Sequence, residues 1–399
     1  MYHCHHMNIP DEIWSEIFSC LTLEDGHGLI SSCRRFNGLT RLPFQFAFPP
    51  KLTFQTKGNR PDIVMEIDKL KTEIHIGDMH ITSLPHGIGN LSNLAFLDIC
   101  FNQLTSLPPE IGNLSNLTFL NIHNNLLTYL LPEIGNLENL VHLDINNNQI
   151  TSLLSEIGNL NNLIYLDISN NQITSLPYEI GRLQRLTYLD ICHNLVASLP
   201  SELGNLRNLD QLHLCNNQLA SIPSEIGNLS NLTELYIRNN RLISIPPEIG
   251  NLRKLDRLII SNNQLTSLPF EIGNLRTLSS LQINENRFIS LPPEIGNLYS
   301  LDRLNISNNY LISLPPEIGN LRNLCGLYMN NNSLISLPPE IGNLRNLYDL
   351  HINNNHLISL PPELGNLHNL TSLHIHDNHI TLLPSELENL HGLHIFVVL

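Results

Sequence analysis

The feature that most constrains the fold of this chain is a repeat with a period of 23 residues. The segment 94–104 recurs at 117–127 and 140–150, and the pattern continues without insertion or deletion. Each copy carries an asparagine at the same place, which gives thirteen copies, at 102, 125, 148, 171, 194, 217, 240, 263, 286, 309, 332, 355 and 378. A fixed period of this length is typical of a solenoid, in which each repeat packs against its two neighbours.

The residues of one repeat predict a short strand, a turn and a return segment. Leu97 and Ile99 alternate with other residues, which indicates a strand that turns two apolar side chains inward. Asn102 ends the strand, and we expect its side chain to bond backbone groups of the turn and of the next repeat. The segment 108–110 (P-P-E) opens a short helical return segment. We expect Gly112 to allow a tight bend. Stacked copies predict an α/β repeat solenoid with a parallel sheet.

The repeat also resembles a known family. The pattern L-x-x-L-x-[IL]-x-x-N-x-L resembles the leucine-rich repeat, and the filler L-P-P-E-I-G-N-L resembles the intracellular 23-residue subclass of Ras-suppressor and Scribble-type scaffolds. The resemblance implies a horseshoe with the parallel sheet on its concave face. The solenoid is expected over residues 74–399, with about fourteen repeats of 23 residues, the C-terminal one truncated.

Both ends of the solenoid are expected to depart from the pattern. Ile74, Ile76 and Ile81 stand in the frame of a degenerate first repeat, preceded by a linker or cap at 46–73 in which 52–54 predicts a strand against that repeat. At the other end, Phe396 and Val398 stand in the frame of a last strand.

Residues 7–45 do not follow the period and predict a separate small helical module. Apolar residues at 13, 17 and 21 share one helix face, and a unit this small holds little core of its own, so its apolar face favours a partner. The strings I-P-x-E-I at 9–13, I-F-x-x-L at 17–21 and C-R-R-F-N at 33–37 resemble an F-box. The resemblance implies docking on a Skp-type adaptor of a cullin ubiquitin ligase through Pro10, Ile13, Ile17, Phe18 and Leu21. The alternative is a helical cap that only shields the solenoid.

The positions that vary between repeats are the candidate partner-binding residues. Side chains that flank the two core residues of each strand face the concave side. Early repeats combine aromatic and acidic residues there, and later repeats add arginines, which are among the residues most used at protein interfaces. The residues expected to bind a partner are Phe96, Asp98, Phe119, Asp144, Tyr165, Asp167, Tyr188, Asp190, Tyr236, Arg238, Arg257, Arg303 and Tyr328. The alternative is sequence drift on a solvated face.

Composition and motifs exclude several classes of function. A formal charge of −15 (21 basic, 36 acidic) disfavours nucleic-acid binding. The sequence has no apolar run long enough for a membrane span and no secretory signal, and its seven scattered cysteines favour a reducing, cytoplasmic setting. No catalytic or cofactor motif appears. His374 and His376 with His351 on the next strand lack a nearby cysteine or strong carboxylate, so no metal site is expected.

These observations predict a non-enzymatic protein-interaction chain without cofactor, monomeric outside its complex. The first interpretation is a substrate receptor of a cullin-type ubiquitin ligase, with the F-box on the adaptor and the concave face on the target. The alternative is a signalling scaffold that binds a Ras-type GTPase or another protein. Repeats this uniform also resemble those of giant DNA viruses of protists, which implies action in the host cytoplasm.

Overall fold

The computed structural model describes residues 51–56, 63–66 and 71–396. The F-box-like region at 7–45, including all five expected adaptor contacts, lies outside the described residues, as does Val398. The described chain divides into two compact units: residues 51–150 with Asn159–Leu163, and Thr151–Gly158 with residues 164–396. In this part of the chain, no helix is long and apolar enough to cross a membrane.

The first unit contains an antiparallel sheet and the first parallel strands. Strand β1 (Lys51–Thr56) pairs with β2 (Ile63–Glu66) on one side and with β4 (Ile81–Ser83) on the other. The strand expected at 52–54 against the first repeat is therefore confirmed. The parallel strands are β3 (Glu73–His75), β5 (Phe96–Asp98), β6 (Phe119–Asn121) and β7 (His142–Asp144).

The second unit has the same parallel pattern, with each strand from β9 onward paired to the one before it. Up to β17, partners across neighbouring strands are 23 positions apart in sequence, as the repeat predicts. The strands are β8 (Tyr165–Asp167), β9 (Tyr188–Asp190), β10 (Gln211–His213), β11 (Glu234–Tyr236), β12 (Arg257–Ile259), β13 (Ser280–Gln282), β14 (Arg303–Asn305), β15 (Gly326–Tyr328), β16 (Asp349–His351), β17 (Ser372–His374) and β18 (His394–Phe396).

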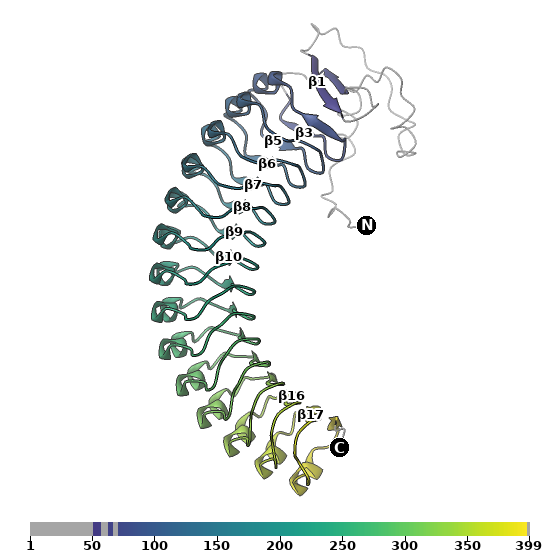
Figure 1. Cartoon of the computed structure of the whole chain (residues 1–399), viewed down its shortest axis with the longest axis vertical. Helices are drawn as coiled ribbons and strands as arrows, with labels where there is room; N and C mark the ends of the chain where they lie inside the picture. The colour runs from purple at the N-terminus through teal and green to yellow at the C-terminus, as the bar shows by residue number, and fades with distance from the viewer. Residues whose placement is uncertain (1–50, 57–62, 67–70, 397–399) are drawn as a thin grey trace, which may run out of the picture. The chain divides into compact units, whose positions relative to one another are not determined.

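The return segments are 3₁₀ helices of five residues, on the side of each coil opposite the strand (Figure 1). The amide of Ile111, for example, donates to the carbonyl of Pro108 at 3.0 Å, one residue closer than in an α-helix. A 23-residue repeat leaves room for only one such turn. The segments are η1 (His86–Asn90), η2 (Pro109–Asn113), η3 (Pro132–Asn136), η4 (Ser155–Asn159), η5 (Tyr178–Arg182), η6 (Ser201–Asn205), η7 (Ser224–Asn228), η8 (Pro247–Asn251), η9 (Phe270–Asn274), η10 (Pro293–Asn297), η11 (Pro316–Asn320), η12 (Pro339–Asn343), η13 (Pro362–Asn366) and η14 (Ser385–Asn389).

The core consists of the predicted apolar positions. Leu97 and Ile99 are almost completely buried, and the same holds for their equivalents along both units. The degenerate first repeat is confirmed, because Ile74, Ile76 and Ile81 are buried and β3 pairs with β5. The parallel-strand solenoid predicted from the sequence is thus confirmed within each unit.

The asparagines form the expected ladder, but their bonds run in the opposite direction. Asn125 donates from Nδ2 to the carbonyls of Ile99 and Ile122, both at 3.0 Å, and its Oδ1 accepts the amide of Leu104 at 3.0 Å. Ile99 and Leu104 belong to the preceding repeat, so the expectation of bonds to the next repeat was wrong. The amide of Leu104 is directed toward the following repeat, whose asparagine satisfies it inside the core.

The glycine of the return segment has a role different from the one expected. No glycine from 71 to 396 other than Gly392 has a positive φ, so Gly112 does not serve to make an unusual bend. A Cβ at Gly112 would instead lie 2.6 Å from the carbonyl oxygen of Glu133 in the next repeat. The residue is glycine because adjacent coils approach too closely for any side chain.

The left-handed conformation occurs one residue before each ladder asparagine. In the repeats this position has φ between +51° and +58°, and it is most often asparagine, which tolerates that conformation. Phe101, His193 and Glu285 are exceptions that adopt the same φ with less suitable side chains. The sequence shows the column as asparagine-rich, but its backbone role appears only in the structure.

The last strand is out of frame by one residue. Strand β18 pairs Ile395 with Leu373 and Phe396 with His374, which is a shift of 22 rather than 23. Phe396 therefore lies in a last strand as expected, but one residue away from the place that the 23-residue frame gives it. Its ring stacks on the ring of His374, with centroids 4.2 Å apart, but the Phe396 side chain stays exposed at the end of the described sheet.

Candidate protein-binding face

The side chains that flank the buried middle residue of each parallel strand form what we call the open face of each unit. Of the thirteen residues predicted to bind a partner, all but Arg238 belong to this face, and Arg238 lies two residues beyond the end of β11. Twelve of the thirteen are half-exposed or exposed. The exception is Asp167, which is buried with 8% exposure and accepts the amide of Ser169 at 2.9 Å.

In the first unit, rings on the open face stack from strand to strand. The ring of Phe96 stacks on that of Phe119 with centroids 4.1 Å apart, and Phe119 stacks on His142 at 4.3 Å. His75 lies against the other side of Phe96 at 4.6 Å. Because strands of a sheet are about 4.8 Å apart, identical columns place rings at stacking distance. The result is a continuous apolar strip on an otherwise polar face.

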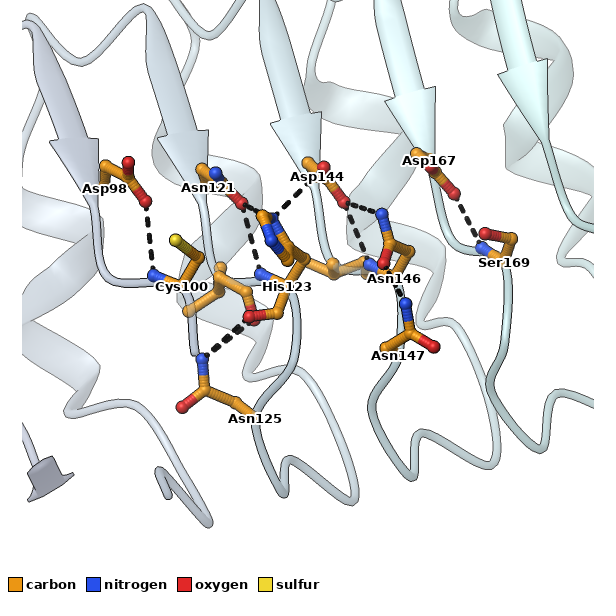
Figure 2. A network of polar contacts seen from close by, with 12 residues as sticks. Asp98, Cys100, Asn121, His123, Asn125, Asp144, Asn146, Asn147, Asp167 and Ser169 are labelled. Atoms are coloured by element: carbon orange, nitrogen blue, oxygen red, sulfur yellow. Dashed lines mark hydrogen bonds and ion pairs between the residues drawn. The ribbon is translucent and has the colours of Figure 1, made fainter. Parts of the chain in front are cut away.

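The acidic row beside this strip terminates the strands. Asp98, Asn121 and Asp144 each accept the backbone amide of the residue two positions on, at 3.2, 3.2 and 3.0 Å. Figure 2 shows these bonds side by side at the ends of successive strands. The row therefore has a structural role that aspartate and asparagine fill equally well, and only aspartate adds charge.

Neighbouring groups affect the protonation of the titratable side chains at this strip. Burial works against ionisation of Asp98, but the nearby His75 and the hydrogen bonds of Cys100 outweigh it and lower the pKa of the Asp98 carboxyl. His142 shows the opposite balance, because burial lowers the pKa of its imidazole despite the nearby Asp144. At neutral pH the Asp98 carboxylate at the border of the strip is therefore anionic.

The second unit begins with a similar arrangement of rings and carboxylates. Tyr165 stacks on Tyr188 at 4.5 Å, and His213 stacks on Tyr236 at 4.7 Å. Asp190 lies among them, with its Oδ2 3.3 Å from His213 Nδ1 and accepting the Tyr188 hydroxyl at 3.3 Å. Burial opposes the charge of Asp190, but the bond with His213 and the amide of Cys192 outweigh it and lower the pKa of this carboxyl.

The arginines of the second unit are exposed, and two of them already contact carboxylates. Arg257 lies 3.3 Å from Glu234 and 3.7 Å from Asp256, and Arg303 lies 3.6 Å from Asp302. Both arginines are exposed, so each carboxylate has only a small effect on the arginine beside it.

Cys192 and Cys215 lie two residues beyond the ends of β9 and β10, in adjacent repeats, and both are free thiols. The amide of Cys215 donates to the Cys192 sulfur at 3.1 Å. A hydrogen bond from Cys192, together with Arg238 and His213, lowers the pKa of the Cys215 thiol against the effect of burial. The pKa of the Cys192 thiol is raised instead, because this thiol is hydrogen-bonded to Cys215, is largely buried and lies beside the negative charge of Asp190.

Near the end of the described sheet, β16 and β17 bring together side chains of which the sequence analysis considered only the histidines. His351 and His374 are stacked with centroids 4.0 Å apart, whereas His376 bonds the neighbouring Asp377 instead. The carboxylate that seemed to be missing is Asp349, whose Oδ1 lies 2.7 Å from His351 Nε2. Asp349 stands two residues before His351, so the alternation of the strand could have revealed it. Burial and the nearby His351 lower the pKa of the His374 imidazole.

A second exposed feature was missed because it lies outside the strands. Four isoleucines follow the ladder turns of successive repeats and are 51% to 61% exposed: Ile289, Ile312, Ile335 and Ile358. The earlier repeats of the second unit have threonine, alanine or isoleucine at this position. The sequence could have revealed this feature, because this repeat position is isoleucine in four successive later repeats but varies in the earlier ones.

Repeats that combine one short strand, an asparagine turn and a 3₁₀ return segment define a class of parallel-strand solenoids. A family model described as a leucine-rich repeat region matches residues 126–237, 202–286 and 271–351, and one described as a leucine rich repeat matches 93–114 and 369–390. The chain belongs to the leucine-rich repeat family. The fold of this family is typically a non-enzymatic scaffold for protein interactions.

Solved structures of the same fold come from bacteria and plants. A leucine-rich repeat protein of Leptospira interrogans is 35% identical, with a TM-score of 0.64, covering 82% of this chain and 96% of that chain. Internalin F of Listeria monocytogenes is 27% identical, with a TM-score of 0.66 and coverage of 82% and 86%. The plant peptide hormone receptor RGFR1, in complex with RGF2, is 30% identical, with a TM-score of 0.61 and coverage of 83% and 63%. Among curated proteins, none matches this sequence.

Proposed function

We propose that this chain is a protein-interaction module whose open face binds a basic segment of a target protein. The observation that carries the proposal is the strip of stacked rings bordered by carboxylates, as at Phe96, Phe119 and Asp98. A lysine or arginine of a partner is attracted to the carboxylates, and the methylene groups of its side chain can pack against the exposed parts of the rings. The plant neighbour RGFR1, which is seen with the peptide hormone RGF2, supports a peptide or protein ligand.

The finer part of the proposal is that the target is brought to a cullin-type ubiquitin ligase. Its support is the F-box resemblance of residues 7–45, in which Ile13 and Phe18 would contact a Skp-type adaptor. The chain would then act by proximity, because tethering raises the local concentration of the target near the ubiquitin-loaded enzyme. Cytoplasmic location is part of this proposal, as is a chain that is monomeric outside its complex.

Charge-neutral variants test the open face without altering its backbone. Asp98→Asn, Asp144→Asn and Asp190→Asn together remove three charges but retain the oxygen that accepts the backbone amide, as Asn121 already does. A matched control replaces Glu294, Glu317 and Glu340 on the return segments by glutamine. We expect affinity capture from cells to lose its specific partners with the aspartate variants and keep them with the control. Equal recovery with both variants refutes a role for the face.

A binding assay with a purified Skp-type adaptor tests the ligase part separately. We expect the full chain to bind the adaptor, and Ile13→Asp or Phe18→Ala to abolish binding while the solenoid stays folded by circular dichroism. No binding by the wild-type chain refutes the F-box role and leaves the open-face proposal standing. Capture of a Ras-type GTPase that depends on guanine nucleotide would favour the scaffold alternative.

A further inference from the structure

The group formed by Asp349, His351 and His374 has the composition and placement of a metal-binding site. Asp349 and His351 are two positions apart on β16 and therefore share its open face. His374 lies directly opposite His351 on the neighbouring strand β17. One ligand atom from each residue can be chosen so that all three lie within 4.8 Å of one another. Among the described residues, no other group of three such side chains meets this condition.

The surrounding side chains hold each of these groups in place. The hydroxyl of Tyr328 donates to Asp349 Oδ2 at 2.9 Å, which leaves Oδ1 directed at His351. The ring of His374 is held between two others, with centroids 4.0 Å from His351 and 4.2 Å from Phe396. Outer partners of this kind orient the ligands before an ion arrives. In other metal sites, removing such a partner lowers the metal affinity.

We propose that Asp349, His351 and His374 bind one divalent transition-metal ion of the Zn²⁺ type. Two imidazoles and one carboxylate suit Zn²⁺, Cu²⁺, Ni²⁺ or Co²⁺, whereas Mg²⁺ and Ca²⁺ require mostly oxygen ligands. All three residues are half-exposed, so the remaining coordination position is open to water. On binding, the ion replaces the direct contacts of His351 with Asp349 and of His374 with the Ser372 hydroxyl, now 2.7 and 2.9 Å. The His351 ring also turns out of its stack on His374, so that one nitrogen of each ring points at the ion.

A stacked histidine pair nearby provides the matched control. His356 and His379 lie on adjacent repeats with ring centroids 5.7 Å apart, and both are exposed. They offer two imidazoles at the same spacing in sequence but belong to no three-ligand group in the described residues. Replacing both by alanine removes more imidazole than the test variant does, without touching the proposed ligands.

The test is calorimetric titration of the chelator-treated full chain with ZnCl₂. Because the first residues are rich in histidine and include a cysteine, the chain carries His3→Ala, Cys4→Ser, His5→Ala and His6→Ala throughout. We expect one equivalent of Zn²⁺ to bind. His374→Ala and Asp349→Asn should weaken binding by at least the 10- to 100-fold that loss of an outer partner costs, and Tyr328→Phe by about that amount. His356→Ala with His379→Ala should leave binding unchanged.

Two results overturn the proposal. One is undiminished Zn²⁺ binding by both His374→Ala and Asp349→Asn, each shown to be folded by circular dichroism. The other is the absence of an anomalous-scattering peak between the three side chains in crystals soaked in ZnCl₂. Asp349→Asn keeps an oxygen for the Tyr328 hydroxyl, so a loss of binding in that variant reports on the ligand charge rather than on misfolding.

Discussion

Removing one rung of the asparagine ladder should destabilise the second unit far more than a surface substitution does. Asn263, buried at 8% exposure, donates from Nδ2 to the carbonyls of Ile237, Ile260 and Ser261 at 3.0, 3.2 and 3.2 Å. Its Oδ1 accepts the amide of Leu242 at 3.0 Å. Asn263→Ala leaves these buried backbone groups without the side-chain partner that the fold provides.

The size of the effect follows from counting the groups that water cannot reach. The Leu242 amide and the Ile237 carbonyl both belong to the preceding repeat and lose the Asn263 side chain. Each buried unsatisfied group costs about 1–3 kcal/mol, so we expect a loss of roughly 2–6 kcal/mol in the free energy of unfolding. Asn378 makes the same bonds but is half-exposed, so water can replace its side chain, and Asn378→Ala should cost only about 1 kcal/mol.

Urea unfolding followed by circular dichroism measures both variants against the wild-type chain. The comparison is valid where the slope of the transition is unchanged. A lower slope for Asn263→Ala would mean that part of the solenoid unfolds separately, as expected for repeats coupled only to their neighbours. If Asn263→Ala cost no more than Asn378→Ala, the ladder would not stabilise the core as argued here.

Three further changes test other features. Gly250→Ala places a Cβ 2.4 Å from the carbonyl oxygen of Glu271, so the free energy of unfolding in urea should fall by about 1–3 kcal/mol; an unchanged midpoint would contradict this close approach. Glu285→Asn relieves a left-handed residue at φ 56° and should raise the melting temperature, since that conformation costs ordinary side chains roughly 1 kcal/mol; a lower temperature would argue against strain there. Asp190→Asn should reduce the loss of unfolding free energy at acid pH. The folded-state pKa of Asp190 lies below the unfolded value of 3.8, so the ionised carboxylate stabilises the fold above pH 3.8, and this contribution is lost as the pH falls through the folded-state pKa. Unfolding midpoints measured at descending pH check this, and parallel curves for variant and wild type would exclude the contribution.

The sequence alone determined the architecture because a strict period leaves few ways to bury the same residues. Leu97 and Ile99 recur with alternating spacing, and only stacked parallel strands place every copy in one continuous core. The same alternation correctly separated the residues of the open face from those of the core, with Asp167 more buried than its column predicted.

The tertiary structure decided what depends on how neighbouring coils approach one another. The direction of the asparagine bonds, the reason for Gly112 and the stacking of Phe96 on Phe119 are contacts between repeats, and a period read along one chain does not specify them. The same holds for Asp349 and His374, which are 25 positions apart and become neighbours only because β16 and β17 pair in register. Local pattern sets which face a side chain occupies, whereas distances between side chains are set by the packing of one repeat on the next.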